Sequence, residues 1–238
     1  MFFLDPILLL VTMLGAGLCG WASLRVQSTF KRYQDFGVRS GMSGRQAAEA
    51  ICRVAGMNDV QIEKHQGFLS DHYDPRSRSL RLSPAVHDGR SIASVAVAAH
   101  EAGHAIQDSR DYAWLGLRSQ LVPIANFGNR GWSLVLVLGI LAGGYRGEGV
   151  GRLLLIAAAV LFGGVVLFQL VTLPVEIDAS RRAKAVLAQT GIVQTSEEAR
   201  GVEKVLDAAA LTYVAAALAG LLQLAYLIAR IVSASRDE

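Results

Sequence analysis

The stretch LLLIAAAVLFGGVVLFQLVTLPV, residues 153–175, decides the fold class of this chain. It contains no charged side chain, and its 23 residues exceed the roughly 20 that an α-helix needs to cross a lipid bilayer. Residues 6–24 and 208–229 form two further uncharged runs of about this length. Because a soluble domain rarely contains three such runs, we expect these segments to lie in a membrane.

A fourth apolar segment, residues 121–145, is less regular than the other three. Its last 15 residues are uncharged, but the full segment includes Asn126, Asn129 and Arg130. An arginine is tolerated in a span when its guanidinium reaches the interface or faces other helices. With 52% hydrophobic residues and a mean hydropathy of +0.36, the chain is predicted to be a mainly α membrane protein with about four transmembrane helices.

The longest polar segment contains AAHEAGHAIQ, residues 98–107, in an alanine-rich stretch without proline that favours helix. His100 and His104 are four residues apart, so they lie on one helix face and can bind one metal ion. Glu101 lies about 100° further round, where it can reach a water on that ion instead of the ion itself. The pattern predicts a zinc site used for hydrolysis. The alternative is two hydrogen-bonded histidines with an unrelated glutamate between them.

A catalytic zinc ion takes three protein ligands and leaves one position for water, so a third ligand is needed. A ligand on the same side of the membrane as His100 must be separated from it by an even number of spans. This condition excludes Glu148 and admits Glu176 and Asp178, provided that residues 121–145 form a span. The full set of candidates is His65, His72, His87, Glu148, Glu176, Asp178, Glu197 and Glu198.

Glu176 has neighbours that favour close helix packing. Ala179 and Ala183 follow it at i+3 and i+7 and give its helix a face of small residues. The motif helix offers small residues in return, namely Ala99, Ala102 and Gly103. The alternative is that Glu176 is an ordinary carboxylate in a first helical turn, where it complements the helix dipole.

Three stretches resemble the bacterial YugP-like family of membrane zinc metallopeptidases. They are LSDHYDPRSRSLRLSP (69–84), GRSIASVAVAAHEAGHAIQ (89–107) and LPVEIDASRRA (173–183). The resemblance implies Zn²⁺ as cofactor and peptide-bond hydrolysis, with Glu101 as base and His100, His104 and Glu176 as metal ligands. In the related gluzincins an aspartate often follows the glutamate ligand by four residues. Ser180 stands at that place here, so support for the ligands is expected from Asp178 or elsewhere.

In the expected mechanism a zinc-bound water attacks the peptide carbonyl and Glu101 accepts its proton. The oxyanion that forms needs a further hydrogen-bond donor. The candidate donors are His72, Tyr73, Arg181 and Arg182. A strand is expected around residues 79–83, and an exposed edge there is predicted to bind substrate as an added strand.

The expected organisation follows these segments. Residues 1–25 are predicted to be a transmembrane anchor, 26–118 an α+β zincin-like catalytic segment at the membrane surface, and 119–175 two transmembrane helices. A helix carrying the third ligand is expected within 176–207, followed by the last transmembrane helix and tail, 208–238. The helix with Glu176 is expected to begin near Pro174.

The distribution of basic residues predicts the orientation. Near the span ends, eleven arginines and lysines lie on the motif side, against four on the other. The four are Arg146, Arg152, Arg230 and Arg236. Because cytoplasmic loops are enriched in basic residues, we expect a multi-pass protein of the inner or plasma membrane with its catalytic side in the cytoplasm.

Two other functions fit parts of the sequence. The chain is alternatively a membrane scaffold with a structural or vestigial zinc site, or a zinc hydrolase of non-peptide amides. The expected partners are a protein or peptide substrate and the lipid bilayer. A membrane-protein partner or a homo-oligomer is left open. The net charge of +3 and the scattered basic residues predict no nucleic-acid partner.

Overall fold

The computed structural model describes residues 5–144 and 149–234, so Arg146, Glu148 and Arg236 lie outside the described residues. The chain forms two compact units, each built from segments that are distant in sequence. The first unit comprises residues 1–22, 116–173 and 212–238. The second comprises residues 23–115 and 174–211.

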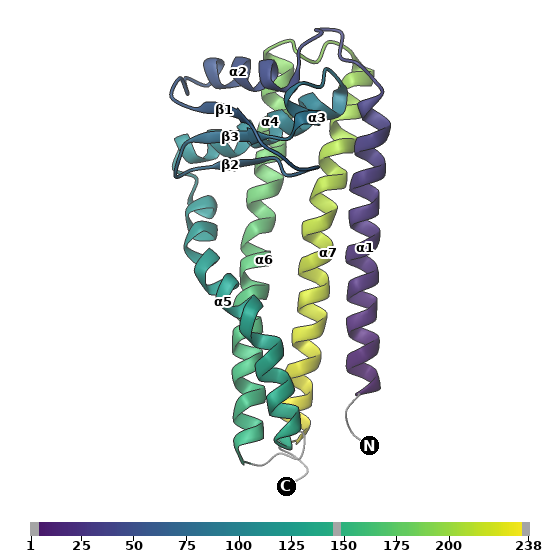
Figure 1. Ribbon diagram of the computed structural model, residues 1–238, viewed down its shortest axis with the longest axis vertical. Helices are drawn as coiled ribbons and strands as arrows, with labels where there is room; N and C mark the ends of the chain where they lie inside the picture. The colour runs from purple at the N-terminus through teal and green to yellow at the C-terminus, as the bar shows by residue number, and fades with distance from the viewer. Residues whose placement is uncertain (1–4, 145–148, 235–238) are drawn as a thin grey trace. The chain divides into compact units, whose positions relative to one another are not determined.

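In the described part of the chain, four helices are long and apolar enough to cross a membrane, which confirms the expected number of candidate spans (Figure 1). They are α1 (Pro6–Gln34), α5 (Ala113–Leu141), α6 (Gly149–Gln189) and α7 (Ser196–Ala234). Residues 121–141 of the irregular fourth segment are thus part of α5, which begins eight residues before residue 121. The division of functions along the chain stays a prediction.

The helices α6 and α7 each continue without a break between an apolar run and a polar segment. The sequence predicted a new helix beginning near Pro174, but α6 continues through this proline and carries Glu176 in its interior. A proline lacks one backbone N–H, so the helix loses a single hydrogen bond while the turns on either side are maintained. Similarly, α7 joins the polar residues after Thr195 to the last apolar run without a break.

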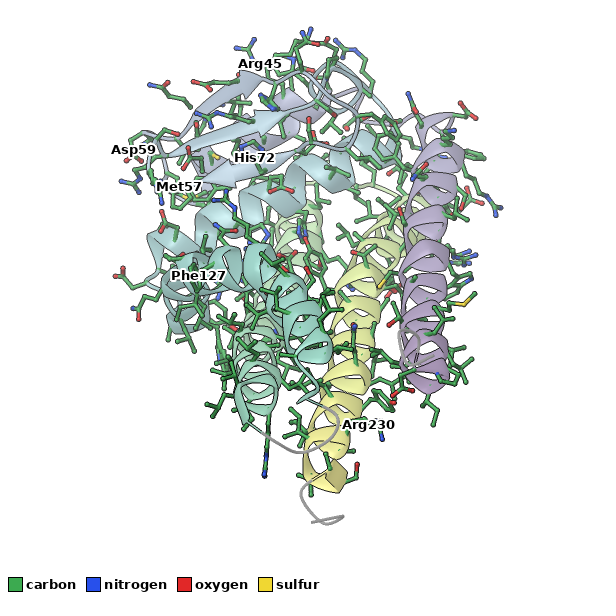
Figure 2. The ribbon with its side chains drawn as sticks, turned by 60° about the horizontal axis from the view of Figure 1, so that its bottom comes forward. Arg45, Met57, Asp59, His72, Phe127 and Arg230 are labelled. Carbon is green, nitrogen blue, oxygen red and sulfur yellow. The ribbon has the colours of Figure 1, made fainter. Side chains whose placement is uncertain are left out.

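Small residues and one polar cluster pack the first unit. A Cβ at Gly128 of α5 would lie 2.7 Å from the carbonyl oxygen of Leu161 in α6, so α5 and α6 approach closely at this point. At the N-terminal end of α1, the Asp5 carboxylate accepts a hydrogen bond from the Tyr226 hydroxyl of α7. It also pairs with Arg230, which Figure 2 labels on α7 (N–O distance 3.1 Å). These contacts join the first and last candidate spans.

The second unit contains a small mixed sheet of three strands. These are β1 (Gln61–Lys64), β2 (His72–Asp74) and β3 (Ser79–Leu82), in the order β1-β3-β2. β1 pairs with β3 in parallel and β2 pairs with β3 antiparallel. β3 is therefore the central strand, and the expectation of an exposed edge at residues 80–82 is wrong. The two edge strands are β1 and β2, and the three residues of β2 are too few to give a recognisable alternation.

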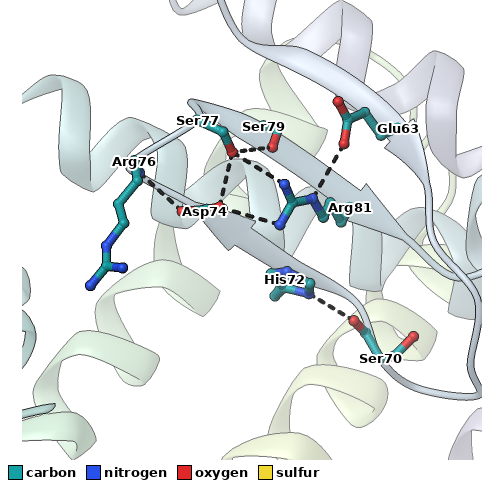
Figure 3. A network of polar contacts seen from close by, with 8 residues as sticks. All are labelled: Glu63, Ser70, His72, Asp74, Arg76, Ser77, Ser79 and Arg81. Carbon is teal, nitrogen blue, oxygen red and sulfur yellow. Dashed lines mark hydrogen bonds and ion pairs between the residues drawn. The ribbon is translucent and has the colours of Figure 1, made fainter. Parts of the chain in front are cut away.

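The two faces of the sheet differ in polarity. One face carries Ile62, Leu80 and Tyr73 in register across the three strands, and Leu80 is fully buried. On the other face the Arg81 guanidinium donates to Glu63 and Asp74, each at 3.2 Å, with His72 beside it (Figure 3). The apolar face packs against the core. On this side of the sheet β2 contacts the helix that carries His100 and His104.

That helix, α4 (Ile92–Ser109), is the centre of the second unit. Fourteen of its 18 residues are buried. It packs against α2 (Gly44–Val54), the short α3 (Pro84–His87), β2 and β3. The surrounding core also draws on buried side chains near one end of three long helices, among them Phe30, Leu187 and Val205. The motif is thus held on every side by packed structure.

Candidate metal centre

The sequence around α4 specifies a helix that starts at a defined residue. The Ser91 side chain accepts a hydrogen bond from the backbone N–H of Ser94 (3.1 Å) and caps the first turn. Alanines then fill much of the helix, which suits both helix formation and close packing. The cap places His100, Glu101 and His104 in the third and fourth turns, within the buried part of the helix.

The structure brings His100, His104 and Glu176 together. His100 Nε2 lies 3.1 Å from Glu176 Oε2, and His104 Nε2 lies 3.6 Å from the same oxygen. One donor atom from each residue lies within 4.8 Å of the other two. Donors around a tetrahedral zinc ion, with bonds of about 2.1 Å, lie about 3.4 Å apart. Two imidazoles and one carboxylate at these separations therefore fit a zinc ion.

Close approach of α4 and α6 makes this convergence possible. A Cβ on Gly103 would lie 2.5 Å from the carbonyl oxygen of Ala179 and 3.3 Å from its Cα. Ala179 and Ala183 are both buried. The small faces expected on the two helices do meet at Gly103 and Ala179. Glu176, only 2% exposed, is one turn before that contact and so reaches the histidines.

Glu101 is also buried, and it contacts the edge strand of the sheet. Its Oε2 accepts a hydrogen bond from the backbone N–H of Tyr73 at 3.1 Å. Burial raises the pKa of Glu101 to about 7, with the charges of Glu176 and Asp71 adding to the effect and His100 opposing it. A carboxylate with a pKa near neutrality can both accept and return a proton near neutral pH.

Each histidine has its second ring nitrogen in a hydrogen bond. Nδ1 of His100 lies 3.1 Å from the Ser180 hydroxyl, and Nδ1 of His104 lies 3.0 Å from Oε1 of Gln107. Both Nε2 atoms are thereby directed to Glu176. The sequence drew attention to Ser180 only as a departure from a pattern, and it did not indicate Gln107. The available signal was its position three residues after His104, on the same side of the helix.

The protein family described as "putative neutral zinc metallopeptidase" matches residues 7–232. The chain belongs to this family. It is also 43% identical, over 214 residues, to the "putative membrane protease YugP" of Bacillus subtilis (strain 168), covering 90% of this chain and 92% of that protein. No solved structure matches the chain.

Within this member of the family, Asp178 of α6 lies in the hydrogen-bond network beside the candidate ligands. Its Oδ2 accepts a hydrogen bond from Gln107 Nε2 (2.9 Å) and pairs with the Arg182 guanidinium. Burial opposes ionisation of Asp178, but the hydrogen bonds from Arg182 and Gln107 prevail and lower its pKa. Arg182 also lies over the Tyr112 ring, 5.4 Å from its centroid. Asp178 therefore contacts Gln107, the hydrogen-bond partner of His104, and its support of a metal site stays a prediction.

The side chains of the candidate oxyanion donors have partners of their own. The Tyr73 hydroxyl donates to Asp108 (2.8 Å), and burial together with that carboxylate raises its pKa. His72 lies on the polar face of the sheet, with Nδ1 2.9 Å from the Ser70 carbonyl oxygen (Figure 3). The Arg181 side chain is 73% exposed and lies 4.0 Å from Asp178. Among the described residues, none of these side-chain contacts is with His100 or His104.

Three of the remaining candidates for the third ligand, His65, His87 and Glu198, have other partners. The His65 ring stacks edge-on against His72, with centroids 5.5 Å apart. His87 pairs with Asp88 at 2.6 Å. Glu198 accepts three backbone N–H bonds, from Arg39, Gln194 and Thr195. Among the described residues, Glu176 is the carboxylate that lies against both motif histidines.

Proposed function

We propose that this protein is a membrane-embedded, zinc-dependent endopeptidase. The observation that carries the proposal is the convergence of His100, His104 and Glu176 beside the buried Glu101. A purely structural zinc site has no use for an adjacent carboxylate with a pKa near 7, whereas hydrolysis requires one. The family and its Bacillus relative, a named membrane protease, support the same function.

In this proposal His100, His104 and Glu176 hold the metal. Zinc bound there supplies Lewis-acid chemistry, activating a water and polarising a peptide carbonyl. The chain's own residues prepare the site for it. Gly103 allows the two ligand-bearing helices to approach, and Ser180 and Gln107 orient the imidazoles.

Glu101 performs the proton transfers. It accepts a proton from the attacking water while the carbonyl carbon gains its C–O bond. It then delivers that proton to the amide nitrogen as the C–N bond breaks, so the products are a carboxylic acid and an amine. The N–H of Tyr73 stabilises the ionised carboxylate before the first transfer and after the second, and it holds the side chain in place.

Substrate binding is assigned to the β2 edge of the sheet. β2 borders α4, and its Tyr73 N–H already points to Glu101. An extended peptide that joined β2 as an added strand would run beside Glu101, held by backbone hydrogen bonds that are independent of sequence. Peptides N-methylated at alternate backbone positions test this assignment. They should inhibit less well than unmodified peptides, and equal inhibition would refute it.

We further propose that the second unit lies at the cytoplasmic surface of a cell membrane. All four of its connections to the apolar runs lie on one side of the bilayer if each of the four candidate helices is a span. Basic residues are concentrated in those segments, as cytoplasmic loops require. A short soluble domain with its metal centre next to the bilayer would suit substrates that are themselves membrane proteins.

The test compares full-length wild type with Glu101→Gln in detergent. We expect about one zinc per chain in both proteins, with cleavage of an unfolded protein substrate by the wild type alone, because the amide cannot accept the water's proton. Glu197→Gln is the matched control, since it makes the same change at an exposed position of α7. Its cleavage rate should equal that of the wild type.

Three outcomes would contradict the proposal in different ways. Cleavage by Glu101→Gln near the wild-type rate would refute Glu101 as the base. Zinc binding without hydrolysis of peptides or small amides by the wild type would favour a scaffold. Hydrolysis of small amides alone would indicate a non-peptide amidase.

A further inference from the structure

The Gln107 side chain is fully buried and makes a complete set of hydrogen bonds. Its Nε2 donates to the Val175 carbonyl oxygen (2.8 Å) and to Asp178 Oδ2 (2.9 Å). Its Oε1 accepts from His104 Nδ1 (3.0 Å). Val175 and Asp178 flank Glu176, so this one amide joins a ligand of α4 to the turn of α6 that carries another ligand.

The partners of Gln107 determine the orientation of its amide. Both partners of Nε2 are acceptors without a proton, because one is a backbone carbonyl and the other a carboxylate paired with Arg182. Reversing the amide would place Oε1 against these two acceptors and forfeit two buried hydrogen bonds, at about 1–3 kcal/mol for each group left unsatisfied. Oε1 therefore faces His104, and it can only accept.

A hydrogen-bond acceptor at this position selects one tautomer of the His104 imidazole. His104 must carry a proton on Nδ1 to bond with Gln107, which leaves Nε2 as the nitrogen that can offer a lone pair to a metal. His100 differs, because its partner is the Ser180 hydroxyl, which can either donate or accept. The two ligands are therefore not equivalent, and the structure distinguishes them.

We propose that Gln107 is a positioning residue that fixes His104 as an Nε2 ligand and aligns it with Glu176. This inference rests on the proposed zinc-dependent function. Partners that orient metal-bound histidines typically contribute 10–100-fold to metal affinity. Gln107 acts on His104 and on the backbone around Glu176 together, so its loss should weaken both ligands.

The experiment measures zinc affinity of the full-length protein by competition with a chromogenic chelator. Gln107→Leu removes the hydrogen bonds at similar side-chain volume and should lower zinc affinity 10–100-fold. Gln46→Leu is the matched control: it makes the same change in the exposed capping box of α2 and should leave zinc affinity unchanged. Ser180→Ala should have a smaller effect than Gln107→Leu, because the Ser180 hydroxyl can donate or accept and so does not fix the tautomer of His100.

A second measurement does not depend on any variant. Nitrogen-15 NMR of labelled histidines in the wild type should show His104 protonated at Nδ1 both without metal and with zinc. If Gln107→Leu does not fold, Asp178→Asn replaces it. The new amide can offer a donor to Gln107, so that Gln107 is free to turn, and zinc affinity should again fall.

The possible results separate this inference from the proposed function. A folded Gln107→Leu that binds zinc within twofold of wild type would overturn the inference, as would a His104 with no proton on Nδ1. Wild-type protein that binds no zinc would instead overturn the proposed function. Zinc binding that falls in Gln107→Leu but not in Gln46→Leu supports the inference whether or not a substrate has been found.

Discussion

A single methyl group added at Gly103 should separate the two helices that carry the proposed metal ligands. The Cβ of Gly103→Ala would lie 2.5 Å from the Ala179 carbonyl oxygen. That oxygen belongs to the backbone of α6 and cannot rotate away, as the end of a flexible side chain could. Restoring an ordinary contact of about 3.2 Å requires α4 and α6 to move apart by roughly 0.7 Å.

The displacement is large compared with what a metal site tolerates. His104 Nε2 and Glu176 Oε2 are already 3.6 Å apart, whereas zinc needs its donors about 3.4 Å apart, with bond lengths within about 0.2 Å of their usual values. A shift of roughly 0.7 Å would place this pair about 4.3 Å apart, too far for one zinc ion to bind both atoms. We therefore expect zinc affinity to fall at least tenfold.

Folding should be affected less than metal binding. Overpacking costs about 1–3 kcal/mol, while alanine is favoured over glycine inside a helix by about 1 kcal/mol. The net loss of unfolding free energy in the metal-free protein is therefore about 0–2 kcal/mol. Thermal unfolding without metal measures this loss, and chelator competition measures zinc affinity in the same preparation.

A matched control is available on α5. Gly116→Ala adds the same methyl group to a helix where nothing lies within 4 Å of the new Cβ. It should leave zinc affinity unchanged. If Gly103→Ala bound zinc as tightly as the wild type, the close approach of α4 and α6 would not be what brings the ligands together.

Three further predictions follow from the site and the spans. In the metal-free protein Glu101 has its pKa raised to about 7, so its protonated form is favoured by folding, and stability is lost as pH rises from about 4.5 to about 7. Relative to Glu101→Gln, the wild type should lose about 3 kcal/mol of unfolding free energy across this range, and a difference that does not change with pH would contradict the burial argument. Chelation should lower the melting temperature and zinc should restore it, whereas Glu176→Ala should show little restoration; full restoration would exclude Glu176 as a ligand. In a cysteine-free background, a membrane-impermeant thiol reagent applied to intact cells should label Val150→Cys but neither Asn58→Cys nor Glu197→Cys. Labelling of just one of the latter two would mean that α5 does not cross the membrane.

Residues on one helix could be placed relative to each other from the sequence. The spacing of His100 and His104 determines that they share a face, because the geometry of an α-helix is fixed. The expected packing of Gly103 against Ala179 was also accessible, since small residues recur on both helices. Glu176 was selected by counting spans, and the structure places it against both histidines.

Features that depend on contacts between distant segments could not be predicted from the sequence in this way. The sheet order places β3 between β1 and β2, and three residues of β2 give too short a pattern to identify an edge strand. The continuity of α6 through Pro174 depends on packing that compensates for one lost hydrogen bond. Local propensity favours a break there, and tertiary structure overrides it.

Gln107 shows which part of the site can be predicted from local sequence and which part depends on distant segments. Its position one turn beyond His104 follows from the helix repeat, and a buried amide there was a reasonable partner for Nδ1. What spacing cannot indicate is which end of the amide faces the histidine. That choice is made by Val175 and Asp178, about 70 residues further along the chain, which present two acceptors to Nε2. The form of the His104 imidazole is therefore determined by α6, although the imidazole and the amide both belong to α4. A metal ligand and its hydrogen-bond partner can thus lie in one short motif while the chemistry between them is set by a segment outside it.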